Sequence, residues 1–469
     1  MADFDQDKQQ KVPLGIVLSV SIAFFMENFD GTVLATALPS VARSLNTTVA
    51  AASIGITAYF VSIAIFISLS GWLADRFGTR TIFTAAMCLF ALSSLACAFS
   101  NSLGSFAVAR ALQGVAGAMM VPVGRLIILK NAPRSQLVKT MSLVTTPALM
   151  GAVLGPPVGG LLSSYADWRF IFLINIPIAL VGIVLIRLYI PQMREERRGF
   201  DWLGFIYSGG AVGFLMFGLQ SLVDKRFPSD LTFIIFAVGS ILFVLAARHA
   251  RKKSDGLIDL SLLKYETFRS VVIGGGLFFI FIGSVPYLLP LLLQIGLGYS
   301  AFLSGMVIFS SALGGLFVKQ IAPYMMQKFG FRSVLIFNAL GVAVAMAASA
   351  LLSGKISVFF VAAILFGFGL LRSLQFSALN TMVYAEVPLE RSSRATSLAD
   401  TLKQLWQGVG VGIAAVVVEV LQSRLPQEKH LSAFELAIEV MALFAVVAAI
   451  VFYKLSTDAG SAVSGHKSS

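Results

Sequence analysis

The chain has 469 residues, of which 57% are hydrophobic and only 12% are charged. Soluble globular chains carry about 25% charged residues, so this composition excludes a soluble globular protein and indicates one that crosses a membrane many times. The formal net charge of +12 would also suit a nucleic-acid-binding protein, and the position of the basic residues decides between the two explanations.

Fourteen segments are apolar enough to span a membrane, which takes about 20 helical residues. The predicted spans are residues 13–37, 50–72, 81–99, 105–129, 138–163, 169–189, 203–223, 231–248, 269–296, 302–324, 332–352, 356–380, 395–422 and 433–453. Short connections join them, so few residues remain for a soluble domain. The protein is therefore expected to work inside the membrane.

The basic residues are distributed unevenly between the two sides that these spans define. Most of the 35 Lys and Arg residues fall in connections on the side of both chain ends. Because Lys and Arg are enriched in cytoplasmic loops, both termini are expected in the cytoplasm. The excess charge then faces anionic lipid, so no nucleic-acid partner is expected.

The first span contains two carboxylates, Glu27 and Asp30, in the stretch FMENFDGTVLATALP. An ionised acid at the middle of the bilayer costs about 2.5 kcal/mol or more, so neither side chain should face lipid. Three positions are about 60° apart around a helix, and both acids are expected to face a central cavity. There, protons and a cationic substrate would compete for Asp30, while Glu27 tunes cation preference. Alternatively, Asp30 is a structural acid paired with Arg110.

The connection between spans 2 and 3 reads GWLADRFGTR and contains Gly71, Asp75, Arg76, Gly78 and Arg80. Gly78 permits a tight turn that other residues resist. The acid can interact with a helix N-terminus, and the two arginines can pair with acids or lipid. A simple basic turn that sets orientation is the plain alternative to a conformational role.

Span 4 contains Arg110 and Gln113 inside its apolar run. An arginine at this depth should face the interior of the helix bundle and find a partner there. Asp30 or Glu27 is the expected partner, which the arginine would hold in its charged form. The alternative is an arginine that extends to the membrane interface.

Span 5 contains glycines every four residues, at Gly151, Gly155 and Gly159. Such a stripe lets another helix approach closely. Pro156 and Pro157 should kink the helix and release backbone carbonyls. Taken alone, the pattern fits ordinary helix packing as well as a functional role.

An internal repeat links the two ends of the chain. RFGTR at residues 76–80 and KFGFR at residues 328–332 share the pattern basic-Phe-Gly-x-Arg. Duplicated halves are typical of secondary transporters, so spans 9–14 are expected to copy spans 1–6. The predicted domains are an N-terminal six-helix bundle (1–190), a linker with two extra spans (191–268), a C-terminal six-helix bundle (269–453) and a cytoplasmic tail (454–469).

The three motifs in spans 2 to 5 resemble motifs A, B and C of the major facilitator superfamily. FDGTVLATALP (29–39) and WRFIFLINIP (168–177) resemble its fourteen-span drug:proton antiporter (DHA2) family, and the likeness covers nearly the whole chain. It implies an all-α membrane fold of two six-helix bundles plus two extra spans. Because motif C is associated with exporters, it also implies efflux. Two departures are Thr79, where motif A usually has a basic residue, and Glu27, which the span-1 signature lacks.

The second half has fewer motifs but several polar side chains within spans. Interior polar groups of this kind should face a cavity or a partner. The candidates are Arg372 and Gln375 in span 12, and Gln404 and Gln407 in span 13. Gln113 in span 4 belongs to the same set.

These observations predict a proton-coupled exporter of amphipathic, cationic drugs or toxic compounds, working by alternating access. The alternative is efflux of a specific metabolite such as an organic acid or its metal chelate, because Arg110 and Arg372 would suit an anion. A membrane sensor on a transporter fold is a third hypothesis. Coupling to sodium instead of protons stays open.

No enzymatic role is expected, because the sequence contains no evident nucleophile–base set. It also has no GxxxxGK[ST] phosphate loop and no metal-ligand spacing, so neither ATP, a metal nor a cofactor is expected. The expected partners are a small-molecule substrate, protons and membrane lipid. The protein is expected to be a monomer in the bacterial cytoplasmic (inner) membrane.

Overall fold

The computed structural model describes residues 12–132, 137–194, 199–222, 228–252, 259–318, 321–350, 357–388, 391–424 and 430–461. Within these ranges all regular structure is helical and no strand occurs, which confirms the predicted all-α class. The first eleven residues and residues 462–469 of the predicted tail lie outside the described part.

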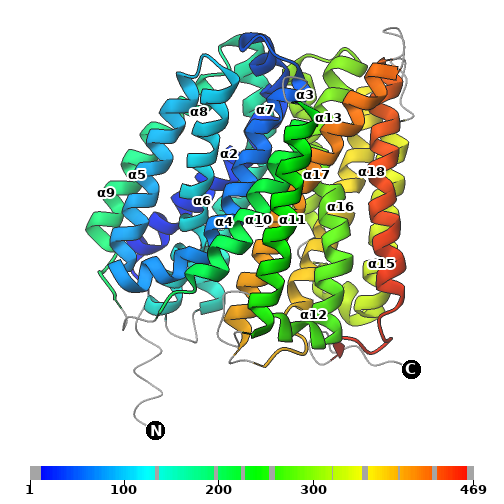
Figure 1. Ribbon diagram of the computed structural model, residues 1–469. Coiled ribbons are helices and arrows are strands. Elements are labelled where there is room, and N and C mark those ends of the chain that lie inside the picture. The colour runs from blue at the N-terminus through cyan, green and yellow to red at the C-terminus, as the bar shows by residue number, and fades with distance from the viewer. Residues whose placement is uncertain are drawn as a thin grey trace, which may run out of the picture.

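The helices fall into three sets along the chain (Figure 1). The N-terminal group is α2 (Leu14–Ser44), α3 (Val49–Ala52), α4 (Ile54–Phe77), α5 (Thr79–Ala98), α6 (Leu103–Asn131), α7 (Leu137–Tyr165), α8 (Phe170–Leu173) and α9 (Asn175–Tyr189). The middle pair is α10 (Trp202–Ser221) and α11 (Ser229–Lys252). The C-terminal group is η2 (Leu260–Lys264), α12 (Glu266–Ser270), η3 (Val271–Gly275), α13 (Gly276–Leu291), η4 (Leu292–Gly296), α14 (Ala301–Phe317), α15 (Ala322–Ala350), α16 (Val358–Met382), α17 (Ser392–Arg424) and α18 (His430–Tyr453).

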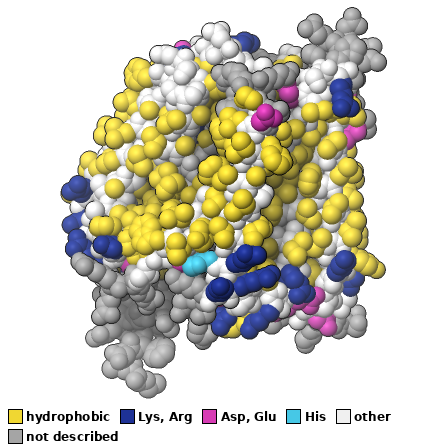
Figure 2. Space-filling model, in the orientation of Figure 1, with side chains coloured by type: hydrophobic (Ala, Val, Ile, Leu, Met, Phe, Trp, Pro, Cys, Tyr) yellow, Lys and Arg dark blue, Asp and Glu magenta, His cyan; other side chains and the backbone are white. Residues whose placement is uncertain are grey.

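The helices have the length and composition of membrane spans. In the described part, 13 helical segments are long and apolar enough to cross a membrane, and α14 is a shorter apolar helix of 17 residues. Large apolar side chains such as Phe233, Phe337 and Phe359 are 73–86% exposed, as expected for surfaces that face lipid. Figure 2 shows a broad hydrophobic belt, with Lys and Arg gathered along the lower rim.

The two groups lie side by side, and the middle pair stands in front of the seam between them (Figure 1). Helix α10 contacts α11, α4 of the N-terminal group and α17 of the C-terminal group. Only 22% of the residues in the apolar stretches of α10 and α11 are buried, whereas 89% are buried in the apolar stretch within Glu266–Gly296. The middle pair is therefore outside the core that the two groups build.

The predicted repeat appears in the backbone. Gly78 ends α4 with φ +94° and ψ 143°, and Gly330 interrupts α15 with φ +71° and ψ 162°. Positive φ is strained for other residues, so glycine at both positions permits the same break. The predicted connection at 328–332 therefore contains a non-helical residue, Gly330, at which two helical segments of α15 meet. The predicted span 302–324 covers α14 and continues past the helix end at Phe317.

The glycine stripe of α7 packs directly against α2. A Cβ added at Gly151 would lie 2.5 Å from the carbonyl oxygen of Phe25, and one at Gly159 would collide with that of Val33. Residue numbers rise in the same direction along both helices at this contact, from Gly151 and Phe25 to Gly159 and Val33, so the two helices are parallel. This close approach is what a four-residue glycine spacing allows.

Helix α7 also joins the two groups at the upper end of the molecule, where α2 ends and α3 lies (Figure 1). The backbone N–H of Phe302 donates to Ser164 Oγ at 3.0 Å, and the rings of Phe302 and Tyr165 lie 6.0 Å apart. Gly160 and Gly305 remove side chains that would block this contact. The molecule is therefore closed between α7 and α14 at the end opposite the basic rim.

Candidate functional site

Asp30 on α2 and Arg110 on α6 form a fully buried ion pair, with side chains 0% and 1% exposed. Arg110 Nη1 lies 2.5 Å from Asp30 Oδ2 and donates to Gln113 Oε1 at 2.6 Å. Its Nε donates to the Gly55 carbonyl at 2.9 Å, and the guanidinium lies over the Tyr59 ring. The buried charges are therefore paired and hydrogen-bonded, the arrangement that offsets their desolvation.

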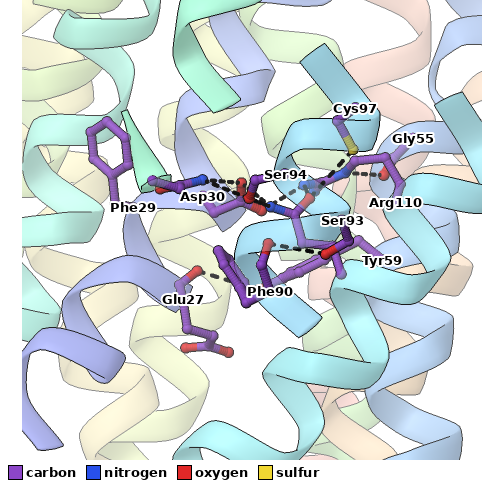
Figure 3. A network of polar contacts seen from close by, with 12 residues as sticks. Glu27, Phe29, Asp30, Gly55, Tyr59, Phe90, Ser93, Ser94, Cys97 and Arg110 are labelled. Carbon is purple, nitrogen blue, oxygen red and sulfur yellow. Dashed lines mark hydrogen bonds and ion pairs between the residues drawn. The ribbon is translucent and has the colours of Figure 1, made fainter. Parts of the chain in front are cut away.

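The second oxygen of Asp30 is held as well. Gln113 Nε2 donates to Asp30 Oδ1 at 2.8 Å, and Asn175 Nδ2 donates to the same oxygen at 3.2 Å. Both amides also donate to Ser94 Oγ. The network joins α2, α4, α5, α6 and α9 (Figure 3). Arg110 thus pairs with Asp30 rather than Glu27, and it does not extend to the interface.

Glu27 points away from this network (Figure 3). Its carboxylate accepts a hydrogen bond from Asn28 Nδ2 at 2.9 Å, and its backbone carbonyl accepts one from Tyr59 at 3.3 Å. Glu27 lines a cavity, whereas Asp30 lines neither of the two described cavities. The expectation that both acids face the cavity is therefore wrong for Asp30. The two side chains point about 60° apart around the axis of α2, so Asp30 faces α6 while Glu27 faces the cavity.

Two adjoining cavities lie between the N-terminal and C-terminal groups, with volumes of about 440 and 340 Å³. They share Leu149 of α7 and Asn380 of α16. The larger cavity is lined by α2, α7, α13, α14 and α16, and the smaller by α2, α4, α6, α7, α16 and α17. Volumes of about 300–1,000 Å³ are typical of small-molecule sites.

An ion-pair cluster crosses the smaller cavity and links the two groups. Arg125 Nη1 on α6 lies 3.1 Å from Asp400 Oδ2 on α17, and Lys403 Nζ lies 3.0 Å from Asp400 Oδ1. Arg125 and Asp400 are not among the site residues predicted from the sequence, whereas Lys403 is one of the polar side chains predicted to lie inside span 13. The signal was a charged side chain inside an apolar span, but 275 positions separate the first pair and no local pattern connects them.

The predicted polar candidates separate into two sets. Arg372 lines the larger cavity and Gln404 the smaller. Gln113 is fully buried in the Asp30 network, Gln375 is fully buried, and neither of them nor Gln407 lines a described cavity. Interior position alone therefore does not identify a cavity residue, because a helix has several buried faces.

The turn after α4 lies at the lower end of the N-terminal group. Asp75 Oδ1 is 3.8 Å from Lys130 Nζ of α6, and the Arg76 guanidinium lies over the Trp72 ring at 5.0 Å. Asp75 is in the last turn of α4, four residues before α5 begins at Thr79. Gly71 has open space around it, and Arg80 follows the break in α5.

A family model described as Major Facilitator Superfamily matches residues 20–411. The chain belongs to the Major Facilitator Superfamily. It is therefore a multi-pass membrane transporter rather than an enzyme. In the described residues, no group of three or more His, Cys, Asp or Glu side chains could hold a metal ion.

Relatives within this superfamily match most of the chain. The "Putative multidrug resistance protein MdtD" of Pectobacterium atrosepticum is 34% identical over 436 residues, covering 93% of this chain and 92% of the relative. The protein of the same name from Escherichia coli K12 is 38% identical over 409 residues, covering 86% of each.

Solved structures show the same fold at low sequence identity. A D-xylose-proton symporter matches with a TM-score of 0.69 and 16% identity, over 96% of this chain and 99% of that chain. The human organic anion transporter MFSD10 (TETRAN) matches with a TM-score of 0.62 and 13% identity, over 94% and 100%. At these identities the likeness concerns the fold alone.

Proposed function

We propose that this transporter exports amphipathic, drug-like compounds from the bacterial cytoplasm in exchange for protons. The multidrug resistance name of its relatives supports the substrate class. The observation that carries the proposal is the pair of acids on α2. Glu27 lines a cavity between the two groups, and Asp30 lies one helical turn away in a buried ion pair.

In this proposal the two acids have different tasks. A substrate with a positive charge contacts Glu27 in the smaller cavity. A proton binds Asp30 and cancels the charge that holds Arg110. Because the Asp30 network ties α2 to α4, α5, α6 and α9, its loss changes how α2 packs in the N-terminal group. Proton binding at Asp30 can therefore cause a conformational change. Direct competition between proton and substrate for one shared acid would not require such a change.

Alternating access would move residues 1–190 against residues 269–453, with residues 191–268 forming the linker and two peripheral spans. The described conformation is closed between α7 and α14 and has the Arg125–Asp400 pair toward the other end. The basic lower rim supports a cytoplasmic position for that end and for both termini (Figure 2). Under this assignment the conformation is closed to the outside.

Transport by the purified chain in proteoliposomes tests the proposal. A pH gradient or a sodium gradient would be imposed against a panel of dyes, biocides and organic acids. Accumulation of an amphipathic compound driven by the pH gradient alone is the expected result. Accumulation driven by sodium alone, or none for any compound with either gradient, would reject proton-coupled export.

A further inference from the structure

Arg372 occupies the larger cavity without a counter-charge. It lies in the middle of α16 and lines the cavity together with Phe376 and Asn380, one and two turns further on. In the described part of the chain no carboxylate or other acceptor forms an ion pair or hydrogen bond with its guanidinium. Its contact is with the Phe368 ring, whose centroid lies 5.5 Å from Cζ. A cation held in an apolar span in this way is a functional candidate.

The balance of charge in the two cavities favours an anion at Arg372. In the smaller cavity, Glu27 and Asp400 offset Arg125 and Lys403. In the larger one, Arg372 is the one charged side chain among the described lining residues. When all five groups are ionised, the two cavities together have one net positive charge, which is that of Arg372. A compound with only positive charge would be repelled at this end.

Arg372 and Glu27 line opposite ends of the two adjoining cavities. Asn380 lines both cavities, and Arg372 is eight residues earlier on α16, which is about 12 Å along a helix. Glu27 lines the cavity at the Asn380 end. Between these ends the wall includes the apolar side chains of Leu149 and Phe376. The two cavities thus offer Arg372 at one end, an apolar wall, and at the other end Glu27, whose neighbour Asp400 is already paired with Arg125 and Lys403.

We propose that the cavity recognises amphipathic zwitterions, with Arg372 binding a carboxylate and Glu27 binding a cationic amine. The inference rests on the proposed function, because it assigns the substrate class of the same cavity. Guanidinium groups suit this role since they form paired hydrogen bonds with carboxylates. Arg372 is then a specificity-determining residue that contacts substrate.

Two fluorescent dyes test this recognition. Rhodamine 110 has cationic amines and a free carboxylate, and rhodamine 123 is its methyl ester, so the two differ only in the anion. Fluorescence anisotropy with the purified full chain in detergent would measure both dissociation constants. The wild type is expected to bind rhodamine 110 about tenfold or more tightly than rhodamine 123, as a charged hydrogen bond requires.

Variants of Arg372 test whether this side chain binds the carboxylate of the dye. Arg372→Gln should weaken rhodamine 110 by about tenfold or more and leave rhodamine 123 within about twofold, while Arg372→Lys should retain part of the preference. Unchanged binding of rhodamine 123 shows that the variant is folded. Arg187→Gln removes an arginine from an exposed position on α9 and should change neither constant.

Three outcomes would overturn the proposal. They are a wild type that binds neither dye, a wild type that prefers rhodamine 123, and an Arg372→Gln variant that affects both dyes equally. Binding in detergent needs no gradient. A failure of recognition here is therefore distinguishable from a failure of proton-driven transport in proteoliposomes.

Discussion

Glu27 and Asp30 differ by three positions on α2, yet their carboxylates have different surroundings. Asp30 is held by Arg110, Gln113 and Asn175, so both of its oxygens are occupied. The Glu27 carboxylate accepts one hydrogen bond, from Asn28, and lines a cavity. The buried acid is suited to control structure, and the cavity-lining acid is suited to contact substrate.

The pairing of Arg110 with Asp30 gives a prediction for stability and coupling. Arg110→Ala leaves the Asp30 charge buried without its partner, which is expected to cost about 3–5 kcal/mol of folding free energy. Without the Asp30–Arg110 contact, the packing of α2 on α6 can no longer respond to proton binding, so substrate movement should lose its dependence on the pH gradient. Thermal unfolding in detergent and transport in proteoliposomes would measure the two effects.

A double variant separates the charge from the shape of the side chains. Asp30→Asn combined with Arg110→Ala removes both charges and should recover part of the stability that Arg110→Ala loses, because no unpaired charge remains. An Arg110→Ala protein that is as stable as the wild type and fully coupled would contradict the proposed role of the pair.

At the scale of helices, the packing of α7 on α2 depends on the absence of side chains. Gly159→Ala should destabilise the protein by about 1–3 kcal/mol, because the new Cβ would collide with the backbone of Val33. Gly367→Ala on α16 is the matched control, since a Cβ there meets no atom within 4 Å. It should be neutral or slightly stabilising. Equal melting temperatures for the two variants would disprove the packing argument.

The turn between α4 and α5 is expected to act on the rate of conformational change. Asp75 interacts with Lys130 at the end of α6, outside the described cavities. Asp75→Asn should therefore lower the rate of transport several-fold and leave the dissociation constant of the substrate nearly unchanged. Comparing turnover in proteoliposomes with dye binding in detergent measures both. A variant that loses binding and turnover together would refute a role of this turn in conformational change.

Local patterns predicted the helices well and their long-range contacts poorly. The apolar runs, the repeat at Gly78 and Gly330 and the stripe on α7 are all visible in the sequence because each depends on neighbouring residues. The choice of Asp30 over Glu27 as the partner of Arg110 depends on how α2 is rotated against α6. The Arg125–Asp400 pair depends on how the two groups meet, which no single segment specifies.

For the molecule as a whole, the basic rim predicts the orientation in the membrane. In a chain without Cys88 and Cys97, Asp167→Cys lies at the end opposite the rim, and Lys252→Cys lies at the end of α11 near it. A maleimide that does not cross membranes should label the first in intact cells and the second only after the membrane is opened. The reverse pattern would invert the proposed topology.

In the proposed mechanism, outward movement of substrate is tied to inward movement of protons through Asp30. Proteoliposomes that contain the full chain and a trapped pH-sensitive dye would be given a substrate gradient with no initial pH gradient. The wild type is predicted to move protons against the direction of substrate flow, and Asp30→Asn is predicted to move none. Substrate flow through the wild type without a pH change, or proton movement by Asp30→Asn equal to that of the wild type, would contradict coupling through Asp30.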